Sequence, residues 1–144
     1  MLVASFWLLT VFGCLFAALF GGKDGRYFAF LFFVGVVATY IAQENSDWRV
    51  THLRLMLVDG LFFVAMIWLM LRSASYWPIW AAACQLMTVL THVATFILRS
   101  FSDRIYEGLS TVWVIPLMLF TIIGIELDRK RTHDRAYAPG SRAA

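Results

Sequence analysis

Five long apolar runs, separated by short polar connections, most constrain what this chain can fold into. A helix needs roughly 17 to 25 mostly apolar residues to cross the hydrocarbon core of a bilayer, which is ~30 Å thick. A hydrophobic share of 61% with only 15% charged residues is also too apolar for a soluble domain of 144 residues. We therefore predict an all-α, polytopic bundle of five transmembrane helices, with approximate bounds of 2–20, 27–43, 54–72, 77–99 and 108–126.

The whole bundle is predicted to form one domain, residues 1–126, followed by a basic tail, residues 127–144. The tail is rich in charge and poor in apolar residues, so we expect it to be disordered beyond its first turns. The glycine-rich segment 21–26 predicts a turn between the first two helices. Pro116 is expected to kink the last helix. Tyr76, Trp77 and Trp80 are residue types that anchor helices at lipid interfaces, so we expect them at the start of the fourth helix.

The distribution of basic residues predicts how the five helices cross the membrane. Five of the twelve basic residues lie in the tail, and eight of the twelve lie on the tail's side of the predicted topology. Basic residues favour the cytoplasmic side, so the C-terminus is predicted to be cytoplasmic and the N-terminus outside. We also expect the tail to contact lipid or a partner through four residues, Arg129, Lys130, Arg131 and Arg135. The positive charge thus indicates membrane topology, and we predict no nucleic-acid partner.

The fourth run carries a line of polar residues that is unusual inside a transmembrane helix. Steps of four and three residues place six side chains on one helical face: Ala81, Gln85, Thr88, His92, Thr95 and Arg99. The remaining faces are apolar and suit lipid. Polar groups in hydrocarbon need partners, so this face is predicted to point toward other helices.

Asp59, in the third run, is predicted to be the partner of His92. The two residues lie on consecutive antiparallel helices, about 7 and 10 Å from the same end of the bundle. An ionised carboxylate is costly at that depth, and a hydrogen bond to an imidazole lowers the cost. We predict that the two side chains lie within direct or water-bridged reach, with Gln85 and Thr88 continuing the polar line inward.

The segment YWPIWAAACQLMTVLTHVA, together with Asp59, resembles a set of small multi-pass membrane proteins of alphaproteobacteria. The resemblance rests on a Trp-Pro start and on a Gln and a His on one face, and it covers the second half of the chain. It implies a bacterial inner (plasma) membrane as the location. No activity is assigned to these proteins, so the resemblance implies none for this chain.

Three interpretations of the polar residues remain open. They can be structural, with Asp59, His92 and nearby charges fixing the helix packing. They can form a ligand site or proton relay, for which the candidates are Asp59, His92, Gln85, Thr88 and Arg99, with a quinone or a lipid as the ligand. A haem or metal held by His52 and His92 is the third, but His52 is expected above the membrane boundary and His92 about two turns inside it.

Motifs support neither an enzyme nor a metal site. The sequence has no glycine-rich phosphate loop, no Ser-His-Asp elbow and no His-Cys metal spacing. Cys14 and Cys84 both lie in apolar runs, where a thiol behaves as a small hydrophobe. The leading hypothesis is a non-catalytic accessory or structural subunit that packs against a larger membrane complex or forms a homo-oligomer. The alternative is a small transporter, a proton relay or a quinone-binding protein that uses Asp59 and His92.

Overall fold

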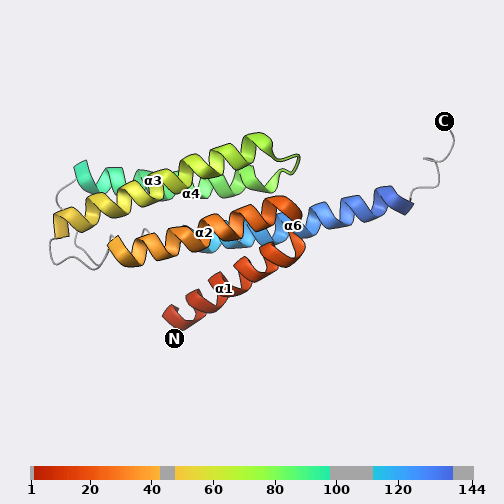
Figure 1. Ribbon diagram of the computed structural model, residues 1–144, viewed down its shortest axis with the longest axis horizontal. Helices are drawn as coiled ribbons and strands as arrows, with labels where there is room; N and C mark the ends of the chain where they lie inside the picture. Colours follow the sequence, from red (N-terminus) through yellow and green to blue (C-terminus); the bar gives the residue numbers. More distant parts are fainter. Residues whose placement is uncertain (1, 43–47, 98–111, 138–144) are drawn as a thin grey trace.

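The computed structural model of the chain describes residues 2–42, 48–97 and 112–137, which form five α-helices and no strand. The helices are α1 (Leu2–Phe20), α2 (Gly22–Ala42), α3 (Trp48–Arg72), α4 (Trp77–Ile97) and α6 (Val114–Tyr137), as Figure 1 shows. The predicted all-α fold is therefore confirmed for the described part of the chain.

Two of the described helical segments, Gly22–Ala42 and Thr51–Arg72, are long and apolar enough to cross a membrane by length and composition. The apolar residues of α4 are interrupted by its polar face, and the second half of α6 is charged. Five membrane spans therefore stay a prediction.

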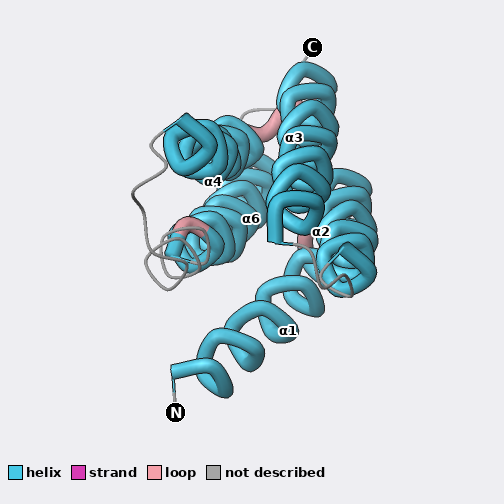
Figure 2. The backbone as a smooth tube through the Cα atoms, turned by 90° about the vertical axis from the view of Figure 1, so that its left-hand side faces the viewer, coloured by secondary structure: helices cyan, strands magenta, loops and turns pink. Residues whose placement is uncertain are grey.

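The described helices form a ring in which each helix packs against two others. The packing pairs are α1 with α2, α2 with α3, α3 with α4, α4 with α6, and α6 with α1. In Figure 2 the N-terminal end of α1 diverges from the rest of the ring. We call the end of the bundle that holds the α1–α2 and α3–α4 connections the turn end, and the opposite end, with the start of α1 and the ends of α2 and α4, the open end (Figure 1).

The turn predicted at residues 21–26 is wrong in extent, because α2 already begins at Gly22. Gly22 has a φ of 60°, a left-handed conformation that glycine adopts without steric cost, and this one residue redirects the chain. Gly25 lies so close to Ala17 that an added Cβ would overlap the Ala17 carbonyl oxygen. Two helices joined this tightly leave no room for a longer loop, so Lys23 and Arg26 belong to the first turns of α2.

The ring is densely packed toward the turn end. The Phe28 and Trp77 rings meet edge to face with centroids 5.6 Å apart, and both side chains are buried. A Cβ on Gly124 would overlap the Cβ of Trp77, so this glycine allows α6 to approach α4 closely. The prediction that Trp77 anchors the chain at a lipid interface is therefore wrong, whereas Tyr76 and Trp80 are exposed.

Helix α6 continues to Tyr137, so the predicted tail begins with about three further turns of helix after residue 126. Arg129 stabilises this extension through an ion pair with Glu126 at 3.2 Å and by stacking its guanidinium over the Phe20 ring, 4.6 Å from the centroid. Figure 1 shows α6 running past the turn end of the bundle. Pro116 lies in the first turn of α6, a position that proline tolerates.

Candidate functional site

The polar face predicted on α4 is buried between helices. The side chains of Ala81, Gln85, Thr88 and His92 are all buried, and Thr95 is half-buried. Helix α4 packs against α3 on one side and α6 on the other, which explains why this face is shielded. Arg99 lies outside the described residues. The prediction that the polar face of α4 points toward other helices is confirmed for the other five positions.

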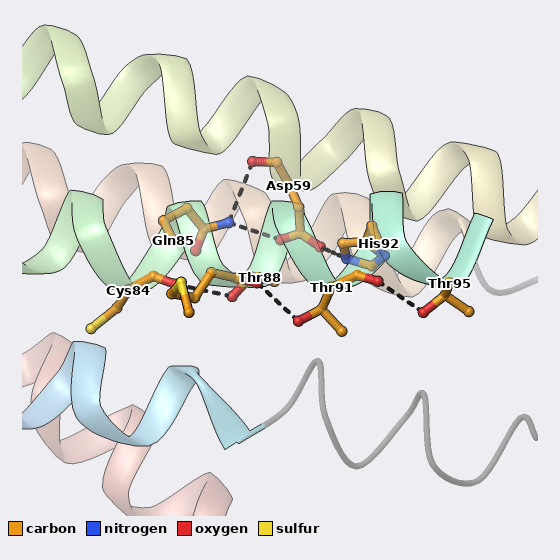
Figure 3. Close-up of polar contacts among 8 residues, drawn as sticks. Asp59, Cys84, Gln85, Thr88, Thr91, His92 and Thr95 are labelled. Carbon is orange, nitrogen blue, oxygen red and sulfur yellow. Dashed lines mark hydrogen bonds and ion pairs between the residues drawn. The ribbon is translucent and has the colours of Figure 1, made fainter. Parts of the chain in front are cut away.

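Asp59 of α3 accepts hydrogen bonds from two side chains of α4 (Figure 3). The His92 Nε2 atom lies 2.7 Å from Asp59 Oδ2, and the Gln85 Nε2 atom lies 3.1 Å from Asp59 Oδ1. The same Gln85 nitrogen lies 3.3 Å from the Asp59 backbone oxygen. The predicted direct contact between Asp59 and His92 is therefore confirmed, and Gln85 extends the cluster along α4. We call Asp59, Gln85 and His92 the carboxylate cluster.

The carboxylate cluster uses its hydrogen-bond donors internally. An ionised carboxylate only accepts hydrogen bonds, so toward that form of Asp59 the Nε2 atom of His92 is the donor. The Gln85 amide nitrogen also donates to Asp59. The Asp59 side chain remains 27% exposed, whereas that of His92 is 3% exposed. His92 and Gln85 thus hold the Asp59 carboxylate in place, and part of its surface stays accessible.

The threonines of α4 satisfy their hydroxyl groups within the helix. Thr88 donates to the Cys84 carbonyl at 3.4 Å, and Thr95 donates to the Thr91 carbonyl at 2.8 Å. Thr91 makes the same kind of bond to Met87. This back-bonding lets a hydroxyl sit in an apolar helix with its proton already used. The oxygen of such a hydroxyl keeps acceptor capacity toward a neighbour.

A cavity of about 530 Å³ lies beside the carboxylate cluster and is lined by residues from all five described helices. Four aromatic side chains contribute to its wall: Trp7, Phe32, Tyr40 and Phe62. Six polar residues contribute as well: Thr10, Thr39, Asp59, Gln85, Thr88 and His92. The volume is in the range of small-molecule sites, which are mostly apolar with a few convergent polar groups.

Sequence reasoning missed two polar residues of this wall, Thr39 on α2 and Thr10 on α1. Thr10 is the more informative of the two. It is 5% exposed, and its Oγ1 atom makes no hydrogen bond to the described residues. A buried hydroxyl without a partner is uncommon in native structures and calls for an explanation. The sequence did contain a signal for this residue. Thr10 is the one residue with a hydroxyl, amide or charged side chain between Trp7 and Phe20, where the others are apolar residues, Gly13 and Cys14.

His52 lies close to the cluster, contrary to the depths expected from the sequence. The His52 and His92 ring centroids are 6.2 Å apart, in an edge-to-face arrangement. The expectation that the two rings lie at different depths is wrong, because α3 begins at Trp48 and already includes His52 in its second turn. Within the described residues, no group of three or more His, Cys, Asp or Glu side chains is arranged to hold a metal ion.

The basic residues that were predicted to contact lipid or a partner lie on the part of α6 that extends past the turn end. Arg129, Lys130 and Arg131 are exposed there, and Arg131 also approaches the Tyr76 ring at 5.9 Å. The side chain of Arg135 lies outside the described part. A basic, exposed helix end is therefore present, and it is remote from the cavity along the chain and along α6.

Together these features define an all-helical bundle with two helices apolar enough to span a membrane and a cavity with one carboxylate in its wall. Comparisons with protein families, with curated proteins and with solved structures found no match for this chain.

Proposed function

We propose that this chain is an integral membrane protein of five spans that binds a small, membrane-soluble molecule in the cavity beside Asp59. The observation that carries the proposal is that all five described helices line the cavity around one part-buried polar cluster. Polar and ionisable groups inside a membrane bundle commonly mark ligand or ion sites, because they are costly where they serve no purpose.

The proposed topology has the N-terminus outside and the C-terminus in the cytoplasm, in a bacterial inner membrane. It is supported by the basic residues at the turn end, because Lys23 and Arg26 lie in the first turns of α2, Arg72 ends α3, and the basic extension of α6 runs past the same end. With this orientation the cavity lies in the outer half of the membrane. A molecule dissolved in the bilayer then reaches the site without crossing the densely packed turn end.

A ring of helices around a cavity also bears on the hypothesis of an accessory subunit. The cavity wall draws on α1, α2, α3, α4 and α6 together, so this chain supplies a site without a partner subunit. One observation still favours the accessory subunit as the second candidate. Helix α6 extends past the bundle with exposed basic residues, a surface that suits a partner subunit or anionic lipid.

A cavity-filling variant tests the proposed function. Gly35 lines the cavity, and a Cβ there would meet only Phe62 Cδ2 at 4.0 Å, so Gly35→Leu places a side chain in the cavity without a clash at the backbone. Gly60→Leu is the matched control, because nothing lies within 4 Å of a Cβ at Gly60 and this residue does not line the cavity.

The measurement is mass spectrometry of the lipid-soluble molecules that co-purify with each protein in mild detergent. We expect one species in near-stoichiometric amount with the natural sequence and with Gly60→Leu, and its loss in Gly35→Leu. Equal recovery from all three proteins would argue against the cavity as the site. Stoichiometric recovery of another membrane subunit, with no such species, would support the accessory function.

A further inference from the structure

Beside Asp59, the cavity wall has side chains whose hydrogen-bond donors are directed to other protein atoms. The protons of the Gln85 amide and of His92 Nε2 are directed to Asp59, and the Thr88 hydroxyl proton is directed to Cys84. What these groups leave toward the cavity are oxygen lone pairs, on the 27% exposed carboxylate of Asp59 and on the Thr88 hydroxyl. A molecule that offers donors therefore matches this wall better than one that offers acceptors.

The charged residues of the cavity wall also favour a molecule that offers hydrogen-bond donors. Among the described residues that line the cavity, none is Lys or Arg, and Asp59 is the one carboxylate. Asp59 is an acidic group in surroundings of low dielectric constant, where a charge interacts strongly with an opposite charge. An anionic occupant is disfavoured at this site, and a cationic occupant is favoured.

The aromatic residues of the wall add a second preference for positive charge. Phe32 and Phe62 contact each other edge to face with centroids 5.9 Å apart, and Trp7 and Tyr40 lie on the same wall. The faces of such rings attract cations and also pack against apolar groups. The unpartnered hydroxyl of Thr10 supplies a further polar contact, on α1.

We propose, building on the proposed function, that the cavity binds a lipophilic organic cation, namely a protonated amine attached to an apolar body. The ammonium group contacts Asp59, and the apolar body occupies the aromatic part of the cavity. Gln85 and His92 are positioning residues, because they hold the carboxylate in place through its two oxygens. An oxidised quinone, which offers only acceptors, matches the wall less well.

A matched pair of fluorescent probes tests this inference. Dansylcadaverine carries a primary amine that is protonated at neutral pH, and its N-acetyl derivative has the same apolar body without the charge. The full chain is placed in nanodiscs of zwitterionic lipid, so that the membrane surface does not attract the amine. Binding is followed by dansyl fluorescence, with empty nanodiscs as the blank.

We expect the amine to bind at least tenfold more tightly than its N-acetyl derivative. Asp59→Asn keeps the shape of the side chain and removes its charge, and we expect it to weaken amine binding at least tenfold while leaving the N-acetyl derivative unchanged. Asp134→Asn is the matched control, because Asp134 is exposed on the extension of α6. This substitution removes the same charge, but far from the cavity. Gly35→Leu is expected to remove binding of both probes.

Equal affinity for the two probes, in the natural sequence and in Asp59→Asn, overturns the inference. If that equal binding is also lost in Gly35→Leu, the proposed function stands and only the cationic preference falls. If neither probe binds, the inference is likewise overturned, and the co-purification experiment decides the proposed function separately. Should Asp59→Asn fail to fold, Thr10→Val provides the second variant, with an expected threefold or greater weakening of amine binding in a protein of unchanged melting temperature.

Discussion

His92 Nε2 lies 2.7 Å from Asp59 Oδ2, and this contact joins the middle of α3 to the last third of α4. Asp59 is eleven residues from the start of α3, about 16 Å along its axis. A carboxylate at such a position has few alternatives to the donors that α4 supplies. The contact therefore combines a structural role with the electrostatic role proposed for the cavity, and the two are separable by mutation.

A double-mutant cycle measures the structural part of the Asp59–His92 contact. His92→Gln removes one donor from a carboxylate that stays in place, so we expect it to lower the free energy of unfolding by about 1–3 kcal/mol. Asp59→Asn combined with His92→Gln should cost less than the sum of the single changes, because the first change removes the charge that needed a partner. Additive losses would mean that the two side chains do not interact in the folded protein.

The stability measurement for this cycle is thermal unfolding in the same detergent for all four proteins. A pH-independent loss that is equal in the two single variants marks a purely structural pair. If the single variants keep their stability and the amount of co-purifying ligand changes, the carboxylate cluster is part of the binding site.

The close approach of α6 to α4 predicts strong position dependence among glycine substitutions. Gly124→Ala places a Cβ onto Trp77 Cβ, and we expect it to destabilise the protein by about 1–3 kcal/mol or more. Gly60→Ala meets no atom within 4 Å, and alanine has the higher helix propensity, so this change should stabilise by up to about 1 kcal/mol. Comparing melting temperatures checks the pair, and equal effects at the two positions would contradict the observed packing.

The topology predicts the behaviour of reporter fusions. Alkaline phosphatase fused after Ala144 should be inactive, since the enzyme requires export, whereas a fluorescent protein fused there should fold and fluoresce. A phosphatase fused within residues 43–47, after the second span, should be active. Activity at Ala144 would reverse the topology or change the number of spans.

The basic extension of α6 predicts a preference for anionic lipid. Replacing Arg129, Lys130, Arg131 and Arg135 with Gln should reduce the association of anionic lipid by about 1 kcal/mol for each residue near the surface. Native mass spectrometry of lipid adducts measures this, with zwitterionic lipid as the control. Unchanged adducts, topology and partner recovery would make the extension a passive end of α6.

The carboxylate cluster could be predicted from the sequence, because it depends on residue spacing within α4 and on the helix that directly precedes α4. The spacing of Gln85, Thr88 and His92 defines one helical face whatever surrounds it. The short connection between α3 and α4 makes the two helices antiparallel neighbours, which brings Asp59 and His92 together. The expected depth of Asp59, about 7 Å from the start of its helix, was too small, because α3 begins at Trp48 and not at residue 54. The same reasoning misjudged His52, since its depth depends on where α3 begins, and helix ends are set by contacts beyond the local pattern.

The sequence by itself determined that this chain is helical and that α4 turns a polar face inward. Only the tertiary structure decided that α6 returns to α1 and closes the ring, that Trp77 is buried against Gly124, and that Thr10 joins the cavity wall. The physical reason is that apolar side chains cover nearly every face of α1 and α2. Apolar residues suit both lipid and neighbouring helices, so periodicity does not tell the two apart, and only the packing of all the helices selects which faces meet.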